Sequence, residues 1–244
     1  MPAPPETPFL GRGPLGAVVF DLFFTLINPL DQRVAGESEY AVLGMDREDF
    51  EARYTADYET WGRGKLRDPV QIMTRTLRGL GVSPDRICRA AEARMERIRR
   101  AIYGIEEKNL TLLRELREGG YKIALVSNAD VMDIRYWPGS ALSRAFDQII
   151  FSCEEGLLKP DPRIFALAAE KLRLESRACL YVGDGGHREL TGARAAGMIP
   201  VLTTEYISRI WPEKIEALGK DADRVIQSLD EIRRLIPWGP EPQA

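Results

Sequence analysis

The stretch Ala17-Val18-Val19-Phe20-Asp21 decides the fold, because four consecutive apolar residues end at a carboxylate. A strand that is buried on both faces has such an uninterrupted apolar sequence. Comparable runs recur four times further along the chain, at residues 123–126, 149–151, 179–182 and 199–202. Together these runs predict five strands of one parallel sheet.

Helix-length segments with apolar residues three and four positions apart lie between these runs. One is marked by Leu110, Leu113 and Leu116, and another by Ile164, Phe165, Leu167, Ala168 and Leu172. A strand followed by a helix, repeated, is typical of a parallel sheet with helices on both faces. The expected fold class is therefore α/β, with a Rossmann-like doubly wound parallel sheet as its core.

Residues 29–107 interrupt the alternation, because they contain helical patterns and no buried-strand pattern. In the segment 94–103, for example, Met95, Ile98 and Ile102 recur in helical phase. We therefore expect an all-helical cap domain over 29–107, inserted after the first strand into a core formed by 15–28 and 108–244. The prolines and glycines of residues 1–14 predict a disordered tail.

Composition and charge narrow the class of protein. The formal net charge is -3 and the basic residues are scattered, so we expect no nucleic acid partner. The chain has three widely spaced cysteines, an odd number that suits a reducing compartment. No signal peptide or membrane-spanning stretch is visible. These features predict a cytoplasmic protein that binds no membrane. The sequence leaves both a monomer and a homodimer open.

Polar residues follow the predicted strands where each of them ends. In an open parallel sheet these ends lie at one edge, where ligands bind. Taken singly, each such residue also suits a helix cap or a turn. Their coincidence at successive strand ends favours one site, able to hold a phosphate and a hard cation, that contains Asp21, Ser127, Asn128, Lys159 and Asp184.

Four segments resemble, in order and spacing, the motifs of the haloacid dehalogenase superfamily. They are VVFDLFFTL at 18–26, ALVSNAD at 124–130, GLLKPDPRIF at 156–165 and YVGDGGHRELTGARAAGM at 181–198. The helical stretch after the first motif resembles that superfamily's cap. The resemblance implies a hydrolase that acts on a small molecule, with Mg²⁺ as cofactor in its phosphatases.

The resemblance also implies roles for individual residues. Asp21 would be the covalent nucleophile, Ser127 and Asn128 would contact the transferred group, and Lys159 would offset its charge. Thr25 would fix the first loop. The implied magnesium ligands are Asp21, the main-chain carbonyl of Phe23, Asp184 and, through water, Glu189.

Phe23 departs from the pattern of the phosphatases, because it stands where they carry a second aspartate that acts as general acid and base. Phe23 would contact the substrate at this position, but its ring cannot transfer a proton. Three readings stay open: a magnesium-dependent phosphatase that uses an aspartyl-phosphate intermediate, a 2-haloacid dehalogenase-like hydrolase without metal, and a non-catalytic binding or regulatory protein. A halide leaves without a proton, but Asp184 in the fourth motif favours a metal site.

The predicted cap offers side chains that can reach a substrate, although aromatic residues at helical spacing more often pack against each other. These side chains are Arg53, Tyr54, Tyr58, Trp61, Arg63 and Lys65. The single histidine, His187, is expected in a loop that borders the site.

Overall fold

The computed structural model describes residues 15–31 and 36–236, so the predicted tail at 1–14 lies outside it. Its centre is a six-stranded sheet with the order β3-β2-β1-β4-β5-β6, and every pairing in it is parallel. The strands are β1 (Ala17–Phe20), β2 (Lys122–Ser127), β3 (Gln148–Phe151), β4 (Cys179–Gly183), β5 (Ile199–Thr203) and β6 (Arg224–Ile226).

The five strands predicted from apolar runs are confirmed to within one residue at either end. The sixth, β6, was not predicted because it has only three residues, of which Arg224 and Val225 are exposed. A short edge strand with solvent on its outer side carries no continuous apolar run.

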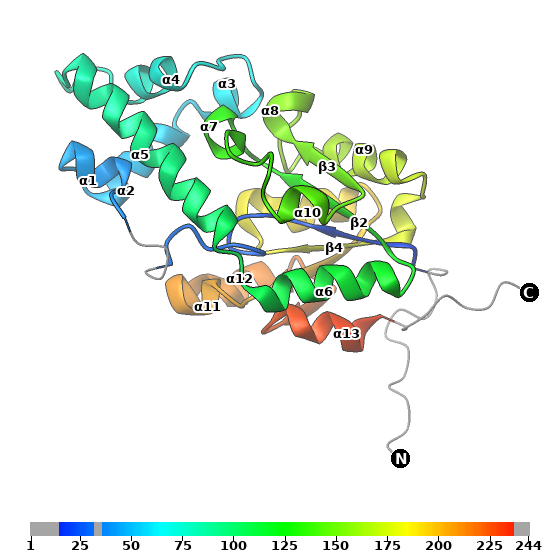
Figure 1. Ribbon diagram of the computed structural model, residues 1–244. Coiled ribbons are helices and arrows are strands. Elements are labelled where there is room, and N and C mark those ends of the chain that lie inside the picture. Colours follow the sequence, from blue (N-terminus) through cyan, green and yellow to red (C-terminus); the bar gives the residue numbers. More distant parts are fainter. Residues whose placement is uncertain (1–14, 32–35, 237–244) are drawn as a thin grey trace, which may run out of the picture.

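Helices cover both faces of the sheet and create two apolar cores, as expected for a Rossmann-like fold (Figure 1). Alternate residues of β1 divide between these cores: Val18 and Phe20 face α6 (Glu107–Glu118) and α13 (Ile232–Leu235). Val19 faces the opposite core, which includes α9 (Pro162–Leu172) and α10 (Glu189–Ala195). Short helices complete the fold, namely α7 (Val131–Ile134), α8 (Ser152–Glu155), α11 (Ile207–Ile210) and α12 (Ile215–Gly219).

The described residues between 36 and 103, here called the helical insert, contain helices and no strand. They are α1 (Glu39–Leu43), α2 (Arg47–Thr55), α3 (Tyr58–Gly62), α4 (Pro69–Thr76) and α5 (Pro84–Tyr103). The insert has its own apolar core, in which Phe50, Trp61 and Met73 are fully buried. Figure 1 shows these helices at one end of the molecule, with α5 running toward α6 and the sheet. The domain boundaries at 29 and 107 remain predictions.

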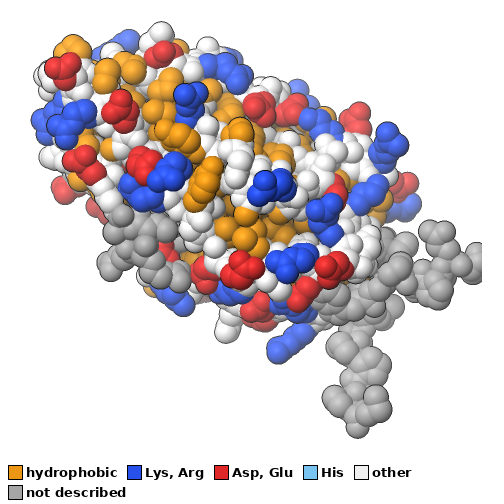
Figure 2. All heavy atoms as spheres, in the orientation of Figure 1, with side chains coloured by type: hydrophobic (Ala, Val, Ile, Leu, Met, Phe, Trp, Pro, Cys, Tyr) orange, Lys and Arg blue, Asp and Glu red, His pale blue; other side chains and the backbone are white. Residues whose placement is uncertain are grey.

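The surface mixes charges of both signs. On the face in Figure 2, Lys and Arg side chains alternate with Asp and Glu and do not form a basic stripe. Among the described residues, no helix combines the length and the apolar character needed to cross a bilayer.

Candidate active site

The sheet brings two carboxylates together from residues far apart in the sequence. Asp21 directly follows β1, and Asp184 follows β4, which pairs with β1 in parallel register. Strand order reverses its direction at this pair, because β2 lies on one side of β1 and β4 lies on the other. The loops diverge at such a switch point and leave a crevice.

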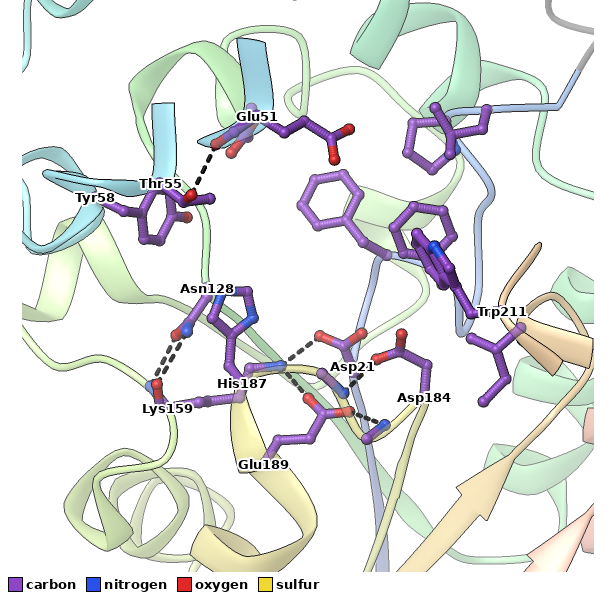
Figure 3. A pocket seen from close by; sticks show the side chains of 18 of the residues that line it. Asp21, Glu51, Thr55, Tyr58, Asn128, Lys159, Asp184, His187, Glu189 and Trp211 are labelled. Carbon is purple, nitrogen blue, oxygen red and sulfur yellow. Dashed lines mark hydrogen bonds and ion pairs between the residues drawn. The ribbon is translucent and has the colours of Figure 1, made fainter. Parts of the chain in front are cut away.

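Lys159 lies between Asp21 and Glu189 (Figure 3). Its Nζ is 2.5 Å from Asp21 Oδ1, 2.5 Å from Glu189 Oε2 and 3.2 Å from the hydroxyl of Tyr181. Burial by itself would lower the pKa of Lys159, but the two carboxylates raise it above its usual value. The side chain is therefore a buried ammonium.

Asn128 holds the backbone of Lys159 in place. Its Nδ2 donates to the carbonyl of Lys159 (3.1 Å), and its Oδ1 accepts from the amide of Lys159 (2.8 Å). The oxygen and the nitrogen of the Asn128 side chain thus both bond to the backbone of Lys159. Asn128 also lines the cavity described below. Its contact with a substrate, expected from the sequence, stays a prediction.

Burial raises the pKa of Asp21 to about 7, and Lys159 opposes this rise. Thr25 donates from Oγ1 to Asp21 Oδ2 (3.2 Å), so this hydroxyl contacts the carboxylate directly. Ser127 ends β2 and is fully buried, and its hydroxyl lies 3.5 Å from the carbonyl oxygen of Asn128. Ser127 does not line the cavity, so its predicted contact with a transferred group is likewise untested.

Three carboxylates face one ammonium at the site. Oxygen atoms of Asp21, Asp184 and Glu189 lie within 4.8 Å of one another. Burial and the neighbouring charges of Glu189 and Asp21 raise the pKa of Asp184 well above its usual value. A hard divalent cation fits this donor set, because it prefers oxygen ligands and would relieve the repulsion.

The two carboxylates after β4 differ in how many donors they already have. Glu189 accepts from Lys159, from the hydroxyl of Tyr181 (2.7 Å) and from the amide of Gly185 (3.0 Å). Asp184 accepts a backbone N–H from Gly186 at Oδ1 (3.0 Å), and within the described part of the chain no donor reaches its Oδ2. A Cβ at Gly183 would collide with the carboxylate of Glu189, so a larger residue there would displace that carboxylate from its hydrogen bonds.

A cavity of about 550 Å³ opens above these groups and is lined by both the core and the insert. Tyr54 and Tyr58 reach it from the insert, as the sequence suggested, whereas Arg53, Trp61, Arg63 and Lys65 do not line it. His187 borders it as predicted, with its ring centroid 6.1 Å from that of Tyr58. Sequence reasoning missed other lining residues, among them Glu51, Thr55, Arg94, Arg97, Trp211 and Lys214.

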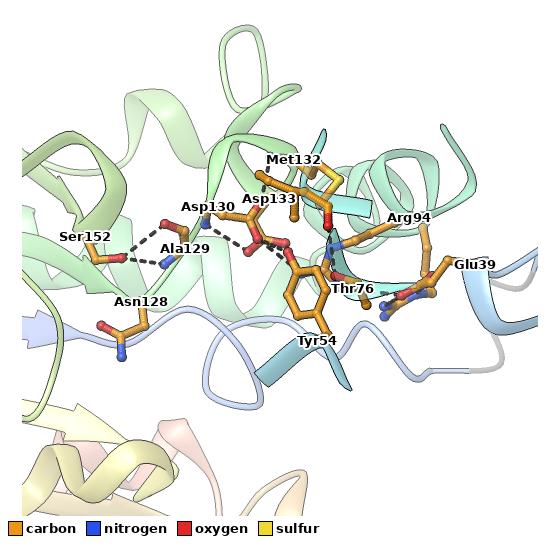
Figure 4. Close-up of polar contacts among 12 residues, drawn as sticks. Glu39, Tyr54, Thr76, Arg94, Asn128, Ala129, Asp130, Met132, Asp133 and Ser152 are labelled. Atoms are coloured by element: carbon orange, nitrogen blue, oxygen red, sulfur yellow. Dashed lines mark hydrogen bonds and ion pairs between the residues drawn. The ribbon is translucent and has the colours of Figure 1, made fainter. Parts of the chain in front are cut away.

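Arg94 of α5 forms a buried ionic cluster with acidic residues of both the insert and the core (Figure 4). Its guanidinium lies 2.7 Å from Asp133, 3.5 Å from Glu39 and 3.7 Å from Asp130, and it stacks 4.1 Å above the ring of Tyr54. The hydroxyl of Tyr54 donates to Asp130. This cluster joins the insert to the segment that carries Asn128.

A doubly wound parallel sheet with a buried carboxylate–ammonium cluster at its switch point, beneath a helical insert, defines a Rossmann-like α/β protein whose candidate active site lies at the carboxyl ends of the strands. The sequence profile of haloacid dehalogenase-like hydrolases matches residues 15–197. The chain therefore belongs to the haloacid dehalogenase-like hydrolase family and is an enzyme of the hydrolase class.

Two curated relatives illustrate the similarity. The haloacid dehalogenase-like hydrolase domain-containing protein 3 of Bos taurus is 34% identical over 125 residues, which are 51% of this chain and 47% of the relative. The phosphoserine phosphatase of Thermus thermophilus is 31% identical over 130 residues, 52% of this chain and 51% of the relative. The chain thus matches about half the length of each.

Two solved structures share the fold. The L-2-haloacid dehalogenase of Xanthobacter autotrophicus aligns with a TM-score of 0.64 at 22% identity, over 91% of this chain and 98% of that protein. A family enzyme of Bacteroides thetaiotaomicron, in complex with magnesium and inorganic phosphate, aligns with a TM-score of 0.59 at 19% identity, over 78% and 94%.

Proposed function

We propose that the protein is a magnesium-dependent phosphatase of a small phosphorylated metabolite. The observation that carries this proposal is the set of charges at the switch point: Lys159 lies between Asp21 and Glu189, and Asp184 stands beside them with an oxygen available. The ammonium complements the negative charge of a phosphoryl group, and the carboxylates complement the positive charge of a cation. The similarity to the phosphoserine phosphatase of Thermus thermophilus supports the choice of reaction.

In the proposed reaction Asp21 attacks phosphorus through one carboxylate oxygen, and the bond from phosphorus to the leaving oxygen breaks. Water then hydrolyses the aspartyl phosphate and releases inorganic phosphate. Lys159 lowers the charge of the nucleophile during approach, and Thr25 orients the carboxylate by its hydrogen bond to Oδ2.

Asp21, Asp184 and the main-chain carbonyl of Phe23 would hold Mg²⁺, with Glu189 supporting them. The bound ion would supply positive charge to the phosphoryl oxygens. Because Glu189 already accepts three hydrogen bonds, its main task in this proposal is to position Lys159 and the loop at Gly185.

Phe23 carries no acid, so the leaving group receives no proton from this position. Acid assistance is usually worth a rate factor of about 10² to 10⁴. We therefore infer slow cleavage of simple alkyl phosphates and faster cleavage where the leaving group departs as a stable anion, as in an acyl phosphate.

The test is phosphate release from acetyl phosphate and p-nitrophenyl phosphate, with Mg²⁺ or with a chelator, for wild type and Asp21→Asn. Mass spectrometry after an acid quench should detect one phosphoryl group on Asp21 of the wild type. Absence of phosphate release from both compounds by folded protein in Mg²⁺ would refute the proposal.

A metal-independent dehalogenase is the second candidate, and the apolar pair Phe23 and Phe24 next to Asp21 favours it. It predicts halide release from a 2-haloacid that persists in the presence of a chelator. We rank the dehalogenase below the phosphatase because Asp184 adds a third carboxylate to a site with one ammonium, and a metal-independent enzyme has no cation to offset its charge.

A further inference from the structure

One wall of the cavity, called here the aromatic wall, is apolar and begins directly beside Asp21. The turn after β1 supplies Phe23 and Phe24, and the segment after β5 supplies Ile207, Trp211 and Leu218. The rings of Phe24 and Trp211 meet edge to face, with centroids 4.9 Å apart and planes at 74°. Figure 3 shows Trp211 on one side of Asp21 and Asp184, with His187 on the other.

The aromatic wall is continuous with the candidate metal site. A Cβ built on Gly185, the residue after Asp184, would lie 2.9 Å from a methyl carbon of Leu218. Leu218 therefore covers the loop that carries Asp184. The carboxylates of Asp21 and Asp184 and the aromatic wall thus line one and the same cavity.

The backbone of the turn makes this wall from consecutive residues. Phe24 adopts a φ of 56°, and its amide donates to the carbonyl of Ile27 (2.7 Å). A phenylalanine rarely takes a positive φ, so the surroundings must stabilise it. The edge contact with Trp211 is one such stabilising interaction.

The aromatic wall carries no carboxyl, imidazole or amine. None of its five side chains can protonate a leaving oxygen, so the wall itself favours a leaving group that is stable as an anion. Nearby, the ammonium of Lys214 lies 4.5 Å from the centroid of Trp211 and lines the same cavity. Its charge favours an anionic leaving group over a neutral one.

We propose that the substrate is an aryl phosphate, a phosphate monoester of a phenol whose ring packs on the aromatic wall; this rests on the phosphatase proposed above. Asp21 bonds to phosphorus, the bond between phosphorus and the phenolic oxygen breaks, and the electron pair leaves on a phenolate. The ring delocalises that charge, and solvent protonates the phenolate after release. Water hydrolyses the aspartyl phosphate to inorganic phosphate and restores Asp21.

The experiment separates two effects on kcat/KM, that of ring packing on the aromatic wall and that of the acidity of the leaving group. Phenyl phosphate is compared with hexafluoroisopropyl phosphate, whose alcohol has similar acidity but no aromatic face, and with acetyl phosphate, all in Mg²⁺. We expect kcat/KM for phenyl phosphate to exceed that for the fluoroalkyl ester about tenfold, the ratio that a favourable ring contact provides.

Trp211→Leu keeps an apolar side chain and removes the ring, so it should lower the ratio of phenyl to fluoroalkyl kcat/KM by about fivefold or more. Tyr136→Leu is the matched control, because Tyr136 is an exposed aromatic residue that does not line the cavity. Thermal unfolding checks that both variants are folded.

The outcomes distinguish the two proposals. Hydrolysis of acetyl phosphate together with equal rates for the phenyl and fluoroalkyl esters overturns the aryl substrate and leaves the phosphatase standing. A loss in Trp211→Leu that is equal for both esters also overturns it, because the wall would then be only an apolar surface. No phosphate from any of the three compounds removes the phosphatase, and the aryl substrate with it.

Discussion

The ammonium of Lys159 lies 2.5 Å from Oδ1 of Asp21, although the two residues are 138 positions apart in the sequence. Both side chains are almost completely buried, at 3% and 6% exposure. The pair is therefore a structural element of the core as well as the centre of the proposed chemistry.

Lys159→Met should lower the free energy of unfolding by about 3–5 kcal/mol, because it leaves the buried carboxylates of Asp21 and Glu189 without their cation. Urea denaturation measures this change. Lys220→Met is the control, since Lys220 is 74% exposed beside Glu216 and should cost less than about 1 kcal/mol. Equal losses in the two variants would contradict a buried ion pair.

Magnesium should stabilise the protein against urea, by about 2.7 kcal/mol at a concentration one hundred times the Kd. Asp184→Asn should lose most of this gain, because it removes the carboxylate that still has an oxygen available. Glu51→Gln removes a carboxylate that lines the same cavity outside the trio and should keep the gain. If Asp184→Asn responds to magnesium as wild type does, the proposed ion site is wrong.

Phe23→Asp should raise kcat/KM for simple alkyl phosphates by up to about 10², because a carboxyl group at this position can protonate an alkoxide. For phenyl phosphate the gain should be smaller, since phenolate leaves without help. Phe24→Asp places the same group one residue further along and should bring no gain. If Phe23→Asp raised kcat/KM more for phenyl phosphate than for alkyl phosphates, the new carboxyl group would not be acting as the missing general acid.

Stability should depend on pH through Asp133. Burial raises its pKa from the ordinary 3.8 to about 7, and Arg94 opposes this rise. Because the folded protein binds the proton more tightly, the contribution to stability is complete below about pH 4 and is lost as the pH rises through about 7. The slope is at most about 1.4 kcal/mol per pH unit.

Asp133→Asn should therefore flatten the fall in unfolding free energy between pH 4 and 7, measured by urea titration at each pH. The pKa values of Asp21 and Asp184 are raised as well, so the comparison is made in an Asp21→Asn, Asp184→Asn background. Asp161→Asn serves as the control, because Arg163 holds the pKa of Asp161 down at about 2, below the window. If Asp133→Asn left the pH dependence of the unfolding free energy unchanged, the pKa of Asp133 would not be raised in the folded protein.

The class of fold could be predicted from the sequence because a strand buried on both faces of the sheet is a continuous apolar run of neighbouring residues. Each central strand is an apolar run, and the polar residue that ends it is adjacent in the chain, as with Phe20 and Asp21. β6 has no such run because its side chains are partly exposed at the sheet edge. The amphipathic spacing of α6 and α9 was visible for the same local reason.

The cavity could not be derived this way, because its lining comes from segments that only the folded sheet brings together. Trp211 belongs to the segment after β5, yet it packs against Phe24 after β1. Arg94 looked like one more charged residue on a helix, but α5 buries it against Asp133. Such contacts depend on the order of the strands and on where the insert rests.

The sequence alone predicted a Rossmann-like parallel sheet, an all-helical insert, and candidate site residues, with Asp21 and Asp184 directly after strands and Lys159 in the loop beyond the third strand. Only the tertiary structure decided that Asn128 binds the backbone of Lys159, that Thr25 donates to Asp21, and that Glu189 shares the ammonium. The physical reason is that strand and helix patterns are encoded over neighbouring residues, whereas hydrogen-bond partners are chosen by distances of a few ångströms between remote ones.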